Sequence, residues 1–145
     1  AFYDSATNDA VLAHELGHAQ DFKKNKRSLL GYQLSLGLAP LVAGLSGLGA
    51  GHLASSLGAS RPLTIGSATA AALIGGLLTG AYGLKREWDA TSNADAYIET
   101  TSNPDSKKRK LRAAFLTYLL ATGIAPAVLT AAVAHTMTNP IFTRD

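Results

Sequence analysis

Three long stretches without a charged side chain constrain this chain more than any other feature. Residues 28–60, 62–84 and 113–143 contain no Asp, Glu, Lys or Arg, so all 13 basic and 10 acidic residues lie elsewhere. A soluble helix needs polar residues on the face that meets water, whereas about 20 apolar residues suffice for a helix to cross a bilayer. We therefore expect an all-α membrane protein with three transmembrane helices.

The alternation of polar and apolar segments predicts four regions along the chain. They are a lead-in and a polar helix (1–27), a transmembrane hairpin (28–84), a polar helix with a basic cluster (85–112), and a third transmembrane helix with a tail (113–145). Two pairs of glycines in the hairpin have GxxxG spacing, which lets membrane helices approach closely. We expect all four to face other helices: Gly47, Gly51, Gly76 and Gly80. The glycine-rich stretch 44–51 is equally consistent with a frayed helix end or a re-entrant turn.

The basic residues predict how the chain lies in the membrane. Eleven of the 13 Lys and Arg side chains precede the first uncharged stretch or lie between the second and the third, which is one side of the membrane if each stretch crosses once. The positive-inside rule places that side in the cytoplasm. A pI near 9.3 also fits a nucleic-acid binder, but no aromatic residue interleaves the basic cluster at 107–112, so we expect a lipid bilayer and no nucleic acid as partner.

A five-residue motif contains the candidate metal-binding and catalytic residues. Residues 14–18 read His14-Glu15-Leu16-Gly17-His18, an HExxH pattern. Residues four apart share one face of a helix, so both imidazoles could reach one Zn²⁺ ion, which in catalytic sites takes three protein ligands. Glu15 lies one step around the helix from His14, where it could take a proton from water as a general base. With no Cys in the chain, the third ligand is expected to be a carboxylate.

The membrane topology narrows the choice of that carboxylate. The acidic residues that follow the hairpin are Glu87, Asp89, Asp95, Glu99 and Asp105. Two residues separate Glu87 from the second span, on the membrane side to which the hairpin returns, and we expect it to be the ligand. The alternative is a surface carboxylate paired with Lys85 or Arg86, an interaction worth little.

In order along the chain, these segments resemble a known family. His14-Glu15-Leu16-Gly17-His18, an apolar hairpin and then Glu87-Trp88-Asp89-Ala90-Thr91 look like the YugP-like neutral zinc metallopeptidases of bacterial membranes. Residues 110–118 resemble the start of that family's last span, so that the likeness covers residues 11–130. It implies a membrane-embedded gluzincin in which His14, His18 and Glu87 bind zinc and Glu15 is the base.

The chain departs from the family in two respects. Thr91 stands where the family usually has Ser, and the family's upstream span and substrate-binding strand are absent. The HtpX-type membrane proteases share the order of HExxH, hairpin and Glu, but they carry an Asp where this chain has Thr91, so they are the more distant likeness.

Other side chains are weaker candidates for the site. A ligating histidine usually donates its second N–H to a carboxylate or a carbonyl group; Asp21 and Asp89 are the nearby carboxylates. Three tyrosines could polarise a substrate carbonyl group, and spacing selects none of them: Tyr3, Tyr97 and Tyr118.

Two functions of different classes follow. The first is a zinc metalloendopeptidase that cleaves peptides or membrane proteins at the cytoplasmic face. The second is a membrane-spanning structural or channel-forming segment of a larger assembly, such as a phage tail or membrane complex, with a vestigial or purely structural metal site. Because the chain begins with Ala1 rather than Met, we expect a fragment, a processed product or the ordered part of a longer chain.

Overall fold

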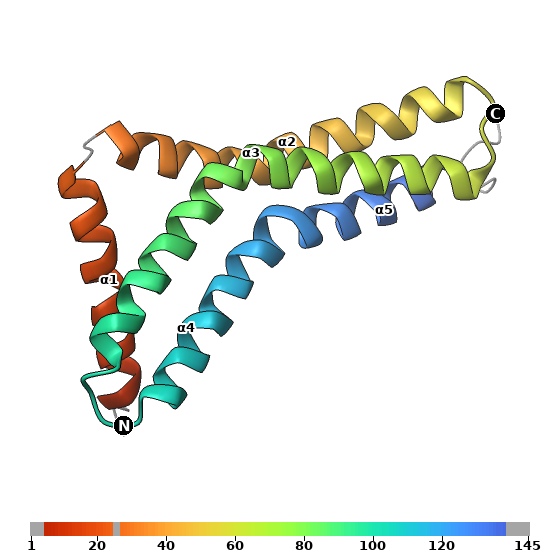
Figure 1. Ribbon diagram of the computed structural model, residues 1–145. Helices are drawn as coiled ribbons and strands as arrows, with labels where there is room; N and C mark the ends of the chain where they lie inside the picture. The colour runs from red at the N-terminus through yellow and green to blue at the C-terminus, as the bar shows by residue number, and fades with distance from the viewer. Residues whose placement is uncertain (1–4, 25–26, 139–145) are drawn as a thin grey trace. The chain divides into compact units, whose positions relative to one another are not determined.

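The computed structural model describes residues 5–24 and 27–138, and their side chains except those of residues 5–8, 21, 24, 27 and 28. Every secondary-structure element in these residues is helical (Figure 1). The elements are α1 (Ser5–Lys24), α2 (Arg27–Ser56), α3 (Arg61–Ile98), α4 (Pro104–Leu119), the π-helical turn η1 (Leu120–Ile124) and α5 (Ala125–Met137). The predicted all-α fold is confirmed.

Three helices are long and apolar enough to cross a membrane. They comprise Leu29–Ser56, Arg61–Ile98 and Pro104–Met137, the last formed by α4, η1 and α5 without a break. With 38 residues, α3 is about 57 Å long, well beyond the ~30 Å of a hydrocarbon core. The second uncharged stretch and the polar residues after it are therefore one continuous helix.

Local sequence explains where the helices stop. Gly58 lies between α2 and α3 with φ of +74°, a left-handed conformation that glycine adopts without steric cost. Asn103 has φ of +56° directly before α4, and Asn tolerates this conformation better than most residues. Pro104 then occupies the first position of α4, where its missing N–H costs nothing.

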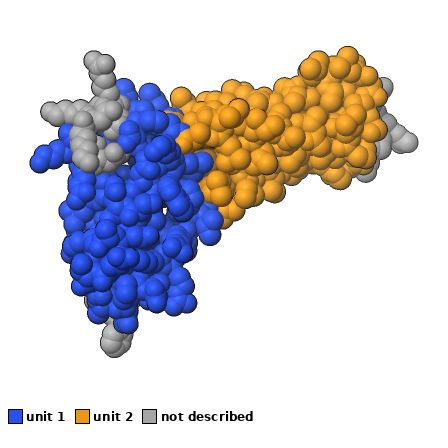
Figure 2. Space-filling model, viewed as in Figure 1, with its two compact units in different colours: residues 1–34, 82–118 blue, residues 35–81, 119–145 orange. Residues whose placement is uncertain are grey.

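The chain divides into two compact units (Figure 2). Unit 1 contains residues 1–34 and 82–118, and unit 2 contains residues 35–81 and 119–145. Unit 1 thus combines α1, the start of α2, the end of α3 and most of α4, segments that lie far apart in the sequence. Eleven of the 13 Lys and Arg residues fall in unit 1, whereas Arg61 and Arg144 fall in unit 2.

Small residues hold the helices of unit 2 together. A Cβ atom added to any of the four predicted interface glycines would lie within about 3.3 Å of another helix, and Gly47, Gly51, Gly76 and Gly80 therefore face helices as expected. Ala43, Ala72 and Ala127 form the buried cluster beside them. Larger apolar side chains point outward, Leu78 and Leu129 being 73% and 67% exposed. This is the pattern of membrane helices, in which small residues allow close packing.

The π-helical turn in the third long helix has a local cause. Pro126 has no N–H to donate to the carbonyl group of Thr122, and its ring would collide with that carbonyl group in a regular α-helix. The helix widens instead, and the N–H of Ala125 bonds to the carbonyl oxygen of Leu120, five residues back. The carbonyl oxygen of Thr122 then lies directly against Gly76 of α3, where a larger residue would not fit.

Unit 1 is held by a different mixture of contacts. Its apolar core consists of Ala10, Ala13, Ala94, Ile98 and Leu111, from α1, α3 and α4. Beside this core, Lys107 is only 1% exposed and donates to Asp9 at 2.9 Å. The ion pair joins α1 to α4 and gives the buried ammonium group a counter-ion.

Candidate metal centre

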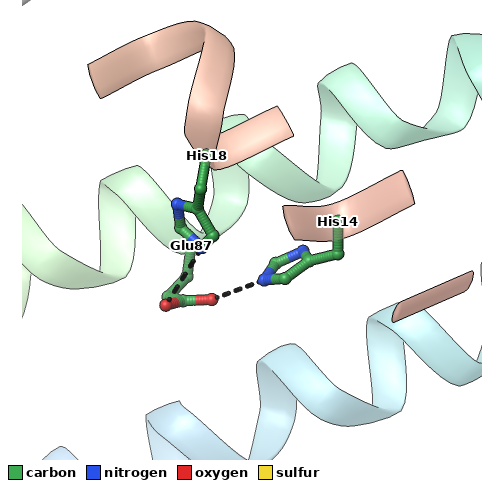
Figure 3. A group of neighbouring side chains, drawn as sticks. All are labelled: His14, His18 and Glu87. Carbon is green, nitrogen blue, oxygen red and sulfur yellow. Dashed lines mark hydrogen bonds and ion pairs between the residues drawn. The ribbon is translucent and has the colours of Figure 1, made fainter. Parts of the chain in front are cut away.

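The two histidines of HExxH project from the same face of α1. The rings of His14 and His18 lie edge to face, with centroids 4.7 Å apart. Both rings point toward the side chain of Glu87 on α3 (Figure 3). One turn of helix therefore presents two imidazole nitrogens to one place, as the spacing predicts.

Glu87 completes the group from 73 residues away in the sequence. Its Oε2 lies 3.1 Å from Nε2 of His14, and its Oε1 lies 3.5 Å from Nε2 of His18. The residue is fully buried, with 0% exposure. It is therefore no surface carboxylate paired with Lys85 or Arg86.

A close approach of two backbones brings these side chains together. A Cβ atom on Gly17 would lie 2.6 Å from the carbonyl oxygen of Ala90, a distance that real Cβ contacts do not reach. Only glycine allows α1 to lie this near to α3. Ala13 and Ala90 are also almost fully buried. The glycine of HELGH and the alanine three residues after Glu87 thus have a packing role that positions the histidines.

Tyr32 is a site residue that the sequence did not reveal. It comes from the start of α2, and its hydroxyl group donates to Oε1 of Glu87. Its ring lies 5.4 Å from the ring of His18, which in turn stacks on Phe22 at 5.5 Å with an interplanar angle of 5°. Residue 32 lies near the start of the first long apolar helix, but nothing in its local sequence distinguishes it from other tyrosines.

Thr91 lies one helical turn after Glu87 and is buried. Its Oγ1 is 3.5 Å from Nδ1 of His14, at the outer limit of a hydrogen bond. A partner on Nδ1 helps to hold the ring so that Nε2 faces Glu87. Nδ1 of His18 is buried without a hydrogen-bond partner among the described residues.

The electrostatic surroundings keep Glu87 ionised. Burial raises the pKa of its carboxyl group, but hydrogen bonds from His14, His18 and Tyr32 lower it more, and the outcome is a pKa of about 2 against an ordinary 4.5. Glu87 lies outside the uncharged stretch of α3. The site therefore offers one carboxylate and two imidazole ligands, which is a set that suits a divalent cation.

The donor atoms fit a small metal ion. One ligand atom from each of His14, His18 and Glu87 lies within 4.8 Å of the others. Ligands bound at ~2.0–2.2 Å to a tetrahedral zinc ion are about 3.3–3.6 Å apart. The two nitrogen-to-oxygen distances, 3.1 and 3.5 Å, end on different oxygens of Glu87, so the three ligand atoms would have to draw closer together to hold the ion.

The other candidate residues lie elsewhere. Glu15 is exposed on α1, beside His14 in the sequence. Asp89 pairs with Lys85 of its own helix at 2.5 Å, and Glu99 pairs with Lys108 at 2.8 Å. The side chain of Asp21 lies outside the described residues. Among the acidic candidates after the hairpin that the structure describes, Glu87 is the one that joins the histidines.

The fold also distinguishes the candidate tyrosines by their distance from Glu87. Tyr118, from the end of α4, is hydrogen-bonded to Tyr32 and lies near enough to Glu87 to interact with its charge. Tyr97 is 48% exposed, and ten residues of helix place it about 15 Å along α3 from Glu87. Tyr3 lies outside the described residues. Tyr118 is thus the tyrosine of the three that the described structure connects to the site.

Comparisons with protein-family models, curated proteins and solved structures find no significant match to this chain. Its function is therefore inferred from the site.

Proposed function

We propose that this chain is a membrane-embedded, zinc-dependent endopeptidase in which His14, His18 and Glu87 bind the metal. The observation that carries the proposal is the convergence of three donor atoms, from α1 and α3, within 4.8 Å of one another. A buried carboxylate directed at two histidines of an HExxH helix is the donor set of many zinc peptidases. The resemblance to YugP-like metallopeptidases supports the same assignment.

Each part of the site has a chemical task in this proposal. When bound, zinc supplies a Lewis acid that lowers the pKa of water to about 7 and polarises a carbonyl group. Glu15 accepts a proton from the attacking water and passes it to the leaving amine. Its exposed position on α1 fits this task, because a base must be reachable by water and by a substrate peptide.

The substrate is proposed to be an unfolded peptide or a membrane-protein segment near the bilayer. Three apolar side chains flank Glu15 in the sequence and are exposed on α1, Val11 and Leu12 by just over half and Leu16 by 44%. Such a surface suits an apolar stretch of polypeptide. Because the site and eleven basic residues share unit 1, the positive-inside rule supports a cytoplasmic location for the reaction.

Metal analysis and peptide cleavage test the proposal together. The chain purified in detergent is expected to hold about one zinc ion, and His14→Ala should lose it. His52→Ala is the matched control, because His52 is an exposed histidine in unit 2. An unfolded protein substrate should be cleaved by the wild-type and His52→Ala chains and by neither after chelation.

Two results would contradict the proposal. A chain that binds no zinc would exclude the metal site. Zinc binding without cleavage in either detergent or liposomes would favour the alternative, a structural segment of a larger membrane assembly.

A further inference from the structure

The carboxylate of Glu87 on α3 is contacted from two other helices. His14 and His18 approach it from α1, and Tyr32 donates to its Oε1 from α2, while α3 carries Glu87 itself. Tyr118 of α4 extends the contacts through its hydrogen bond to Tyr32. One buried carboxylate is thus the point at which all four helices of unit 1 are connected by polar contacts.

Packing alone does not explain the tyrosine at position 32. The ring of Tyr32 lies 5.8 Å from Phe22 and 5.4 Å from His18, and a phenylalanine would fill the same space. What the tyrosine adds is one hydroxyl donor, and that donor is directed at a fully buried carboxylate. Hydrogen bonds to charged groups are among the stronger ones in proteins.

The hydrogen bond also restricts how the carboxylate can turn. With Tyr32 on Oε1, the other oxygen, Oε2, is the one that faces Nε2 of His14. Loss of the phenol hydroxyl would free the carboxylate to rotate and would leave Oε1 without that donor. Groups that orient a metal ligand in this way typically change metal affinity or activity by 10–100-fold when they are removed.

We propose that Tyr32 is a positioning residue that holds Glu87 in its metal-binding orientation, with Tyr118 in turn orienting Tyr32. The inference rests on the proposed function, since it concerns the same zinc ligands. It makes the first membrane helix part of the metal centre. The HExxH helix and the Glu87 helix would then be insufficient for full metal affinity without the start of α2.

Conservative substitutions test this role. Tyr32→Phe keeps the ring and removes the hydroxyl, and Tyr97→Phe makes the same chemical change at an exposed position about 15 Å along α3 from Glu87. Zinc affinity of the full chain in detergent is measured by competition with a chelator. Tyr32→Phe should weaken binding about 10–100-fold, Tyr118→Phe should weaken it less, and Tyr97→Phe should leave it unchanged.

Cobalt substitution adds a readout that a purely structural role would not alter. The visible absorption of Co²⁺ in the site reports ligand geometry, so Tyr32→Phe should change the spectrum while far-UV circular dichroism stays the same. If Tyr32→Phe loses helicity, Tyr118→Phe is used instead, because this variant leaves Tyr32 and Glu87 in place. Weaker zinc binding by that variant supports the role, and wild-type binding overturns it.

The outcomes separate this inference from the proposed function. Wild-type zinc binding together with unchanged affinity and an unchanged cobalt spectrum in Tyr32→Phe would overturn the positioning role alone. A wild-type chain that binds neither zinc nor cobalt would overturn both.

Discussion

The two units of this molecule differ in the polar contacts that join their helices. In unit 2, glycines, alanines and threonines pack backbone against backbone, and Arg61 is the one charged residue in the described part of the unit. In unit 1, ion pairs and hydrogen bonds add to an apolar core, among them Lys107 with Asp9 and the cluster around Glu87. The chain places its chemistry in the unit where charges can be solvated or paired.

This difference is the one expected of a chain that meets both a bilayer and water. Charged groups are expensive in the hydrocarbon core of a bilayer, so unit 2 relies on close contact between small residues. Unit 1 can use charges: Lys107 and Glu87, which are buried, both have partners. Helices α2 and α3 supply both units, so the two long apolar helices also carry Tyr32 and Glu87 of the polar site.

The largest effects should come from changes to the chemistry of unit 1. Glu15→Gln is expected to keep zinc, because the ligands remain, and to reduce peptide cleavage by about 10²–10⁴-fold, the usual contribution of a general base. Glu87→Ala should instead lower zinc content and activity together, which metal analysis and a cleavage assay would measure. Loss of zinc in Glu15→Gln with retention in Glu87→Ala would reverse these roles.

Glycine substitutions in the two units should have different effects on zinc affinity and thermal stability. Gly17→Ala would drive a Cβ atom into the carbonyl oxygen of Ala90, so α1 must move away from α3 and zinc affinity should fall. Gly76→Ala would press on the carbonyl oxygen of Thr122, which should lower thermal stability while zinc affinity is kept. Overpacking of this kind costs about 1–3 kcal/mol.

Gly37→Ala is the control for both, because nothing lies within 4 Å of the added atom. Zinc titration and thermal denaturation in detergent measure the two effects. If Gly17→Ala and Gly76→Ala changed zinc affinity and thermal stability in the same way, the assignment of metal binding to unit 1 and helix packing to unit 2 would be wrong.

Lowering the pH should destabilise unit 1 before it destabilises unit 2. In the metal-free chain the pKa of Glu87 is about 2 in the folded state against 4.5 ordinarily. Its stabilising effect is therefore complete above about pH 4.5 and is lost as the pH falls toward 2. Unit 2 has no acidic residue in its described part, so its helices should persist.

The single Trp of the chain makes this measurable. Trp88 lies in unit 1, with its ring 5.3 Å from that of Phe115. Its fluorescence should change across this pH window while far-UV circular dichroism retains much of its helical signal. Glu87→Gln should show a smaller acid transition, and an identical transition in that variant would assign the effect to other groups.

The smallest effect is expected from Asp89→Asn. Asp89 pairs with Lys85 one turn away on an exposed face, an interaction worth about 0.3–0.5 kcal/mol. Zinc affinity should stay within about twofold of the wild type, because typical losses on removing an orienting partner are tenfold or more. A larger loss, measured by chelator competition, would restore Asp89 as a partner of the ligating histidines.

Features that depend on residues close together in the sequence could be predicted from the sequence. Long uncharged apolar stretches predict helices that cross a bilayer, and the close helix packing at Gly47 and Gly76 is predicted from GxxxG spacing. The HExxH motif is equally local, since helical geometry alone places His14 and His18 on one face. The choice of Glu87 needed the membrane topology as well, because five carboxylates compete for the role in the sequence.

Contacts between distant helices were decided by the tertiary structure alone. Tyr32 has no sequence pattern that links it to Glu87, 55 residues away, and Asp9 has none that links it to Lys107. The packing role of Gly17 depends on the carbonyl group of Ala90, which no spacing rule connects to HExxH. The physical reason is that charge and periodicity act through near neighbours and determine helices, whereas the partners of a buried polar atom depend on how those helices cross.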